Sequence, residues 1–158
     1  IGRGPCCVSG YIGTQGRESW KAGWFHTGDL AWIDQSGRVV IVGRLKEVIV
    51  RGGDKVSPAD VETVLRAYPG IEQVAIIGVA DAMLGERVCA CVVPTCWTQV
   101  PSLEDLRDHS RSEGLAPYKA PELILVLESL PMMGDKIDRR TLVKMAAHLS
   151  ERPQRVVL

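Results

Sequence analysis

The sequence predicts an α+β fold, in which a short β-hairpin and a three-stranded sheet flanked by helices follow a β-rich first part. Two observations lead to this prediction. From residue 48 onward, apolar runs of strand length alternate with amphipathic helical patterns in the order β-α-β-β-α-β-α. Residues 1–28 are instead rich in Gly and aromatic side chains, which favours turns and short strands over helices, and a hairpin pattern follows up to residue 42. We therefore predict a joint between two structural units over residues 43–53, where one pattern replaces the other.

The first part contains a clear hairpin signal. Residues 30–33 and 38–42 are apolar runs of strand length, and residues 34–37 between them are turn formers. Asp29 directly precedes the first of these strands. An acidic residue in that place is commonly part of a turn, so this position alone does not indicate a binding role.

After the joint, the pattern predicts a strand and then a helix. Residues 48–50 form a short β-branched run, and Gly52-Gly53 behind it allows a tight turn or a close approach of the backbone to a ligand. A helix is expected from Pro58, because apolar side chains recur at positions 61, 64, 65 and 68. Pro69-Gly70 ends it.

The remaining core strands are predicted from apolar runs at residues 74–79, 88–93 and 123–127. We expect a loop over residues 80–87 between the first two. A surface helix should begin at Leu103 and end near residue 113, because its apolar face is thin.

The last part of the pattern is a loop followed by a helix. Residues 129–137 contain Pro and Gly and lack an apolar period, which predicts a loop. Asp138 is placed to cap a final helix, in which Leu142, Ala146 and Leu149 repeat at helical spacing.

The composition excludes several classes of protein. Lys and Arg number 19, as do Asp and Glu, so no overall field favours nucleic acid or an anionic membrane, and we expect neither as a partner. No apolar run approaches the roughly 18 residues of a membrane span. The odd number of Cys, 5, indicates reduced thiols and a cytoplasmic location. The 3 His are scattered, so no metal site is expected.

Two groups of basic residues are candidate anion sites. The joint gathers Arg44, Lys46, Arg51 and Lys55 within a short stretch. Lys136 follows a Gly-Asp pair just ahead of a predicted helix N-terminus, where an ammonium group and helix amides would favour the same negative charge. Each has a plainer alternative, because solvated basic faces and loop lysines are common on protein surfaces. The residues by themselves leave both alternatives open.

Several stretches, taken together, resemble a known family. They span nearly the whole chain and occur in the family's order. They are residues 23–29, 43–49, 52–62, 78–81 with 85–86, 118–121, and 130–131 followed by 136–140. The combination resembles the C-terminal part of acyl-CoA synthetases and, more broadly, the ANL superfamily of adenylate-forming enzymes, and it is far more specific than any one stretch.

The resemblance implies a reaction in two steps. A carboxylate attacks the α-phosphate of ATP, which enters with Mg²⁺, to give an acyl-adenylate and pyrophosphate. A thiol, usually that of coenzyme A, then displaces AMP to give a thioester. The expected substrates are therefore a small carboxylic acid, ATP and coenzyme A.

The resemblance also implies roles for three residues in the first step. Asp29 would accept hydrogen bonds from the ribose hydroxyls of the nucleotide, and Arg44 would contact its ribose or phosphate region. Lys136 matches the catalytic lysine that bridges the carboxylate and the α-phosphate. The last loop departs from the family, because it is shorter and Asp135 stands where Gly is usual.

Further roles concern movement and the second step. Lys46 matches the position about which the C-terminal domain of such enzymes rotates between the half-reactions. Gly52 and Gly53 would lie beside the pantetheine channel of coenzyme A, with Arg51 at its edge. One small domain can serve two reactions if it rotates on a short hinge, because few residues need to change their backbone angles.

The resemblance implies the domain organisation as well. Residues 1–43 would be the C-terminal end of a large N-terminal adenylation domain, and residues 44–158 a mobile C-terminal domain with its hinge at residues 44–47. The phosphate-binding loop and acyl pocket of the N-terminal domain are expected outside this sequence. We therefore expect the fragment alone to be inactive.

Two other functions remain open. The acceptor could be the phosphopantetheine of a carrier protein, or the chain could be a truncated, non-catalytic binding module. The pocket that selects the carboxylic acid is expected in the absent domain, so the sequence does not specify the acid.

Overall fold

The computed structural model describes residues 1–7, 17–150 and 156–157. The chain divides into two compact units, Ile1–Lys46 and Glu47–Leu158, each of which is described here by itself. Both fit the predicted α+β class, since the first is built of strands and the second combines helices with a sheet.

The first unit consists of two antiparallel hairpins. After the 3-10 turn η1 (Arg17–Ser19), β1 (Trp20–Lys21) pairs with β2 (Trp24–Phe25). The second hairpin joins β3 (Asp29–Ile33) to β4 (Val39–Arg44), as the alternation of apolar and turn residues predicts. Asp34 fixes its turn, because one carboxylate oxygen accepts hydrogen bonds from the backbone amides of Ser36 and Arg38.

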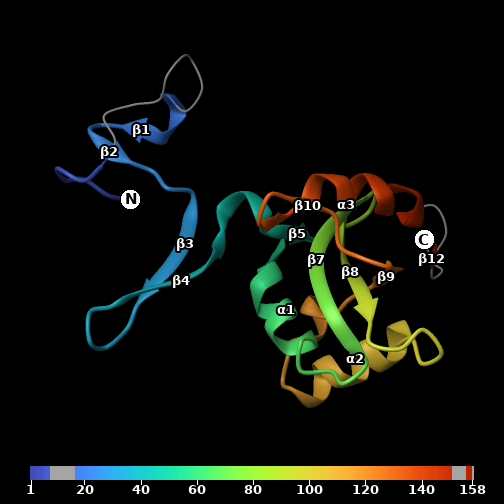
Figure 1. The fold of residues 1–158 in the computed structure, drawn as a ribbon. Coiled ribbons are helices and arrows are strands. Elements are labelled where there is room, and N and C mark those ends of the chain that lie inside the picture. The colour runs from blue at the N-terminus through green and yellow to red at the C-terminus, as the bar shows by residue number, and fades with distance from the viewer. Residues whose placement is uncertain (8–16, 151–155, 158) are drawn as a thin grey trace. The chain divides into compact units, whose positions relative to one another are not determined.

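The second unit is built on a mixed sheet with the order β12-β9-β8-β5-β6, in which β7 also pairs with β8. The prediction of three strands was wrong, because the short strands β5, β6 and β12 join the three predicted core strands in a six-stranded sheet. Its strands are β5 (Ile49–Arg51), β6 (Asp54–Val56), β7 (Ile71–Asp81), β8 (Gly85–Pro94), β9 (Leu123–Val126) and β12 (Val156–Val157). The long antiparallel β7–β8 pair forms the centre, and β9 lies parallel to β8 (Figure 1). A separate small hairpin joins β10 (Met132–Met133) to β11 (Lys136–Ile137).

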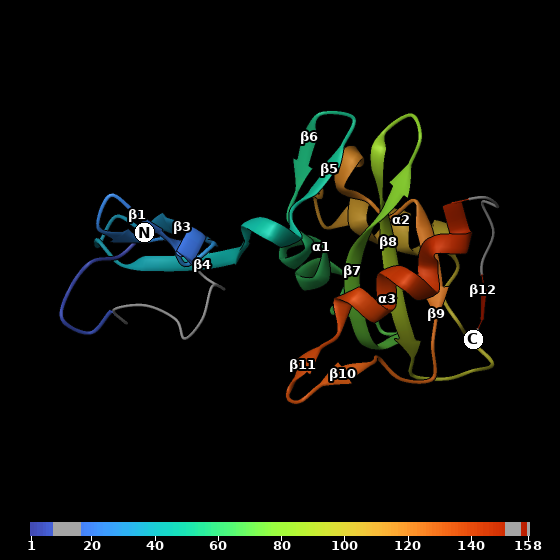
Figure 2. The ribbon, with the colours of Figure 1, turned by 90° about the horizontal axis from the view of Figure 1, so that it is seen from above.

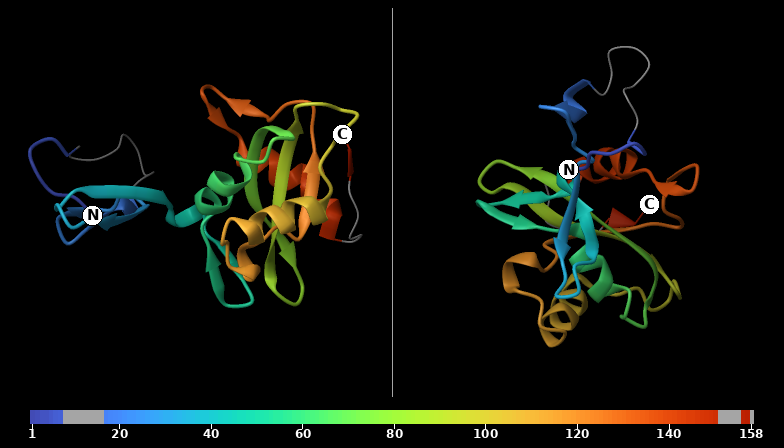
Figure 3. Two further views of the ribbon diagram at one scale, coloured as in Figure 1. Left: turned by 90° about the horizontal axis from the view of Figure 1, so that it is seen from below. Right: turned by 90° about the vertical axis from the view of Figure 1, so that its left-hand side faces the viewer.

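Helices cover both faces of this sheet. Because successive strand residues point to opposite faces, β7 places Ile76 in one core and Ile77 in another. The first core packs against α1 (Pro58–Leu65) and α2 (Leu103–Ser112), and the second against α3 (Arg139–Ala146). Figures 2 and 3 show α3 on the opposite side of the sheet from α1 and α2.

Two predicted loops contain more structure than the sequence suggested. The predicted loop at residues 80–87 is mostly strand, because β7 continues to Asp81 and β8 begins at Gly85. Asp81 closes the turn by accepting hydrogen bonds from two amides of the turn itself, those of Met83 and Leu84. The predicted loop at residues 129–137 contains the β10–β11 hairpin, which apolar periodicity could not reveal since both Met residues are exposed.

Short 3-10 turns complete the fold. They are η2 (Leu45–Glu47), η3 (Pro117–Lys119) and η4 (Ala147–Ser150). Within the part of the chain that the structure describes, no helix has the length and apolar character needed to cross a membrane.

Candidate functional site

Lys136 lies on the narrow β10–β11 hairpin. The antiparallel register pairs Met133 with Lys136, so that Gly134 and Asp135 form the turn. Gly134 has a φ of 65°, a conformation that glycine adopts without the steric cost of a side chain. Lys136 is exposed, and it has no ion-pair partner among the described residues. Its ammonium group is therefore free to meet a negative charge.

The helix behind this hairpin does not offer the free amides that the sequence suggested. Asp138 caps α3, and its carboxylate accepts hydrogen bonds from the amides of Arg140 and Thr141. The hydroxyl of Thr141 also donates to this carboxylate, and these bonds hold the pKa of Asp138 below its usual value. An anion at this end of the unit would thus rely on Lys136 more than on the helix terminus.

Arg139 ties the base of the hairpin to the rest of the unit. Its guanidinium contacts Glu62 Oε1 at 2.7 Å and donates to the carbonyl of Ile76 at 2.6 Å. Its Nε lies 3.4 Å from Glu47 Oε2, next to the boundary between the two units. The Glu62 side chain is only 6% exposed, so this ion pair is largely removed from water. Arg139 therefore joins α1, β7, α3 and the start of the second unit.

Gly52 and Gly53 form the tight turn of a second hairpin, between β5 and β6, as predicted. Their φ values are 56° and 94°, which residues with a Cβ rarely adopt. The amide of Gly52 donates to the carbonyl of Leu84 at 2.7 Å, and a Cβ at Gly52 would lie 3.5 Å from the Leu84 side chain. The turn is thus held against the neighbouring β7–β8 turn.

Arg51, at the start of this turn, forms a bidentate ion pair. Its Nε and one terminal nitrogen donate to the two oxygens of Glu122 at 2.8 and 2.9 Å. These bonds raise the pKa of Arg51. Burial by itself raises the pKa of Glu122, yet the hydrogen bond and charge of Arg51, together with Arg87, hold that pKa below its usual value. The pair is therefore ionised at neutral pH.

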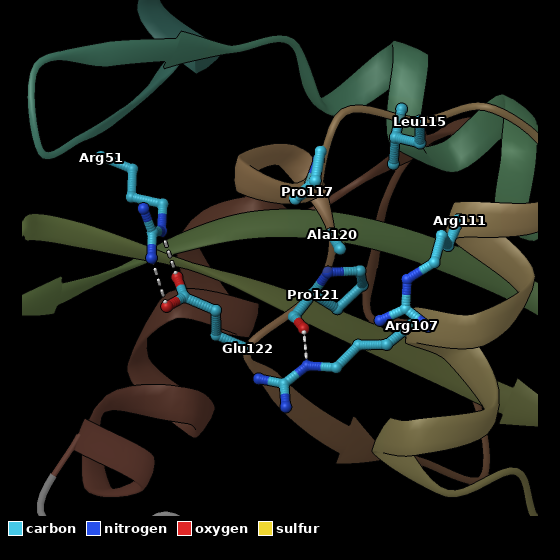
Figure 4. Close-up of a pocket in the computed structure, with 8 residues that line it drawn as sticks. All are labelled: Arg51, Arg107, Arg111, Leu115, Pro117, Ala120, Pro121 and Glu122. Carbon is cyan, nitrogen blue, oxygen red and sulfur yellow. Dashed lines mark hydrogen bonds and ion pairs between the residues drawn. The ribbon is translucent and has the colours of Figure 1, made fainter.

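A pocket of about 260 Å³ opens beside this pair. Its lining combines charged and apolar side chains: Arg51, Arg107, Arg111, Leu115, Pro117, Ala120, Pro121 and Glu122. Figure 4 shows Arg51 and Glu122 on one side of Pro121 and Arg111 on the other, while the Arg107 side chain passes below Pro121 and its guanidinium lies toward Glu122. Arg107 Nε donates to the carbonyl of Pro121 at 2.8 Å, which fixes its position.

The first unit brings Asp29 and Arg44 together. They are paired residues of β3 and β4, and Arg44 Nε lies 3.0 Å from Asp29 Oδ1. Arg44 also donates to the carbonyl of Thr27, while the Thr27 hydroxyl accepts from the amide of Asp29. Asp29 is more than a lone turn residue, because a salt bridge fixes its carboxylate while its side chain stays 28% exposed.

The four basic residues of the joint do not form one cluster within either unit. Arg44 and Lys46 belong to the first unit, whereas Arg51 and Lys55 belong to the second. Lys46 lies in η2 and is exposed, at the last position of the first unit. The ion pair of Arg139 with Glu62 was not predicted from the sequence, although Glu62 lies beside the apolar stripe of a predicted helix, where an acidic side chain can be buried.

Comparisons with known proteins match most of the chain, in a family model, in protein sequences and in a solved structure. Residues 60–135 match the family model of the AMP-binding enzyme C-terminal domain. Oxalate–CoA ligase of Arabidopsis thaliana is 36% identical over 154 residues, which cover 96% of this chain and 29% of that protein. Medium-chain fatty-acid–CoA ligase of Escherichia coli is 38% identical over 132 residues, which cover 82% of this chain and 23% of that protein.

A solved structure agrees with these matches. The o-succinylbenzoate CoA synthetase of Bacillus subtilis, in complex with its acyl-adenylate intermediate, superposes with a TM-score of 0.78 at 31% identity. The match covers 89% of this chain and 29% of that one. The chain therefore spans less than a third of the length of each of these three proteins.

Proposed function

The chain belongs to the AMP-binding enzyme C-terminal domain family of the ANL adenylate-forming enzymes, and from this premise we propose that it is the C-terminal portion of an ATP-dependent acyl-CoA synthetase. The observation that carries the proposal is the 96% coverage of the chain by a CoA ligase, which includes both units. The enzyme would activate a carboxylic acid as acyl-AMP, using ATP with Mg²⁺, and transfer the acyl group to coenzyme A. We also propose that the enzyme is cytoplasmic.

In the first half-reaction, Lys136 would be the catalytic residue. Lys136 directly follows the turn of a narrow hairpin, and its exposed ammonium, which has no ion-pair partner in the described part of the chain, can enter a site formed by another domain. There it would bridge the substrate carboxylate and the α-phosphate, and neutralise charge as the bond between them forms. Arg139 supports this role, because it fixes the base of the hairpin at three contacts.

Asp29 and Arg44 would hold the nucleotide. Asp29 engages Arg44 through Oδ1, which leaves acceptor capacity on the same carboxylate for the ribose hydroxyls. Arg44 keeps a 56% exposed side chain from which it can donate to ribose or phosphate. Their mutual salt bridge would hold both groups in position before the nucleotide arrives.

Lys46 would act as the hinge, and Gly52-Gly53 with Arg51 as the edge of the thiol channel. Figures 2 and 3 support two working faces, because the β5–β6 and β10–β11 hairpins point to opposite sides of the second unit. A rotation at residues 44–47 would present Lys136 for adenylation and the glycine turn for thioester formation. The partner in both states would be the N-terminal adenylation domain.

Two alternative functions, carrier-protein loading and a non-catalytic binding module, predict different outcomes. Transfer to a carrier-protein phosphopantetheine would leave the adenylation step unchanged. A non-catalytic module would support neither step.

A chimera tests the proposal. This chain would replace the matching segment of the Escherichia coli medium-chain fatty-acid–CoA ligase, and pyrophosphate exchange and thioester formation would be measured. We expect exchange in the chimera and thioester formation with coenzyme A in preference to a carrier protein. Absence of both activities in a folded chimera would contradict the proposal, and robust exchange by the isolated 158-residue chain would contradict the expected need for another domain.

A further inference from the structure

The backbone amide of Val50, on β5, is bonded by a side chain where a strand partner would be expected. β5 and β8 are neighbours in the main sheet, but their register contains a single pair, Arg51 with Gly85. The next pair along two antiparallel strands would join Val50 to Glu86. At this place the Oε2 atom of Glu86 accepts the hydrogen bond of the Val50 amide at 2.7 Å. The Glu86 carboxylate therefore replaces a backbone carbonyl where the pairing of the two strands ends.

Gly78, on the neighbouring strand β7, leaves the space that this carboxylate occupies. A Cβ at Gly78 would lie 2.7 Å from Glu86 Oε1 and 2.9 Å from Glu86 Cδ. The second distance is well below the roughly 3.5–4.0 Å of a favourable contact between two carbon atoms. Gly78 does not have a positive φ, so the backbone conformation does not require a glycine here. The lack of a side chain at this position thus serves to seat Glu86 across β7.

The bond from Glu86 fixes the strand that leads into the Gly52-Gly53 turn, because Val50 lies two residues before this turn. The turn itself is held at Gly52, whose amide donates to the carbonyl of Leu84. On the β8 side, Gly85 has a φ of 78°, and a Cβ there would lie 3.4 Å from the carbonyl oxygen of Val50. Together these contacts set the distance between the glycine turn and the β7–β8 turn.

The hydrogen bond between Glu86 and Val50 contributes more to position than to stability. Glu86 is half-buried and the Val50 side chain is 47% exposed, so water can reach the amide when the carboxylate is absent. Exchange of a protein hydrogen bond for one with water changes the net free energy of folding only slightly. A charge-assisted hydrogen bond is however short and strongly directed, so it restricts where the Val50 amide can lie.

We propose that Glu86 is a positioning residue for thioester formation, because its carboxylate, seated over Gly78, holds β5 and thereby the Gly52-Gly53 turn. The role of the turn at the thiol channel rests on the proposed function, whereas the link from Glu86 to Val50 does not. A misplacement of about 1 Å in a supporting group can slow an enzymatic step about 10²-fold. Lys136 lies on a hairpin outside this sheet, so adenylation should not depend on Glu86.

Amide hydrogen exchange of the 158-residue chain, followed by NMR, tests the link without any activity. The Val50 amide should exchange about tenfold or more faster in Glu86→Ala than in the unsubstituted chain, because its protecting acceptor is gone. Glu86→Gln should keep much of the protection, since its side-chain oxygen can still accept the bond. The matched control is Glu72→Ala, which removes an exposed carboxylate from the other end of β7 and should leave the exchange of Val50 unchanged.

Gly78→Ala is an independent probe of the same arrangement. Its methyl group should displace the end of the flexible Glu86 side chain, because the two would lie too close together. The exchange of the Val50 amide should then accelerate about as much as in Glu86→Ala. The double variant should exchange no faster than Glu86→Ala alone, since the methyl group has no carboxylate left to displace.

The same substitutions in the chimera test the role of Glu86 in the reaction. Glu86→Ala should slow thioester formation from pre-made acyl-adenylate about tenfold or more, and leave pyrophosphate exchange within about twofold of the unsubstituted rate. Glu86→Gln should recover most of the thioester rate, and Gly78→Ala should resemble Glu86→Ala. A general structural role would instead lower both half-reactions together, so the ratio of the two rates separates positioning from folding.

Two results would overturn the proposal. They are equal exchange of the Val50 amide with and without Glu86, and equal slowing of both half-reactions in the Glu86→Ala chimera. Circular dichroism of each variant confirms that the chain is folded. A chimera that forms no thioester before any substitution would contradict the proposed function, and protection of the Val50 amide by Glu86 would then still support the link to the glycine turn.

Discussion

The two small hairpins of the second unit have similar turns, but one is part of the main sheet and the other is not. Each has a two-residue turn with a glycine at positive φ, Gly52-Gly53 in one and Gly134-Asp135 in the other. The β5–β6 hairpin belongs to the main sheet and is held by Arg51, which pairs with Glu122. The β10–β11 hairpin is a separate two-stranded sheet, and its Lys136 is exposed.

This difference teaches how one small unit can serve two tasks. A hairpin locked into a sheet keeps a fixed shape, which suits a surface along which a ligand passes. A hairpin that stands apart from the sheet can enter a neighbouring active site and deliver one charge there. Arg139, which follows the second hairpin, holds its end in place through a largely buried ion pair with Glu62.

The largest effect should come from removing the free charge. In the chimera, Lys136→Ala should reduce the rate of adenylation at least about 10²-fold, by the measure of losing one preorganised charge donor in an active site. Pyrophosphate exchange measures it. Lys55→Ala is the matched control, because it removes an exposed lysine from the other hairpin. A similar loss in both variants would mean that the two hairpins do not differ in this step.

The next largest effect should be the loss of stability on removing Arg139, which pairs with the buried Glu62. Arg139→Ala should lower the free energy of unfolding of the second unit by about 3 kcal/mol, because it leaves the carboxylate of Glu62 buried without its closest cation. Urea unfolding followed by circular dichroism measures it. Arg140→Ala, on the neighbouring exposed position, should change stability by less than about 0.5 kcal/mol. Equal losses of unfolding free energy in Arg139→Ala and Arg140→Ala would show that Arg139 does not anchor the unit.

The glycine turns should respond unequally to the same change. Gly53→Ala imposes a φ of 94° on a residue with a Cβ, within a hairpin joined to the main sheet, and should cost about 1 kcal/mol in global stability. Gly134→Ala imposes a similar strain, but the separate hairpin can distort without opening the sheet, so the global cost should be smaller. Thermal unfolding of both variants, compared in one buffer, decides which hairpin is coupled to the core.

The smallest effect is a dependence of stability on pH. The pKa of Glu122 in the folded unit is lowered from its ordinary 4.5, so the ionised form stabilises the fold above that pH. This contribution is lost as the pH falls through the folded pKa. Glu122→Gln should therefore show a shallower fall in stability below pH 4.5 than the unsubstituted chain. Parallel curves would show that the Arg51–Glu122 pair does not stabilise the unit.

Sequence patterns predicted the elements that bury apolar side chains. The core strands and the three helices follow from periodicity, because residues such as Leu65, Leu125 and Leu142 must be covered. The β10–β11 hairpin could not be predicted this way, since its short strands bury little and its register depends on the Gly134 turn. The extension of β7 through residue 81 was likewise hidden, because it depends on the pairing with β8 and not on apolar period.

The contacts around the candidate site could be predicted only in part, because most of them join residues that are far apart in the sequence. The resemblance pointed to Asp29 and Arg44, and the structure brings these two into contact. Arg107, Arg111 and Glu122 meet Arg51 only because α2 and residues 115–122 fold back beside β5, which no spacing along the chain indicates. The basic joint looked like one cluster in the sequence, but its residues belong to two units.

We propose that the two hairpins serve different half-reactions and that the second unit rotates at Lys46 to present one hairpin or the other. The most direct measurement compares both half-reactions in two chimeras, one with Lys136→Ala and one with Lys46→Pro, whose fixed φ would restrict rotation. We predict that Lys136→Ala loses pyrophosphate exchange and keeps thioester formation from pre-made acyl-adenylate, and that Lys46→Pro does the reverse. Equal loss of both half-reactions in either chimera would contradict the account.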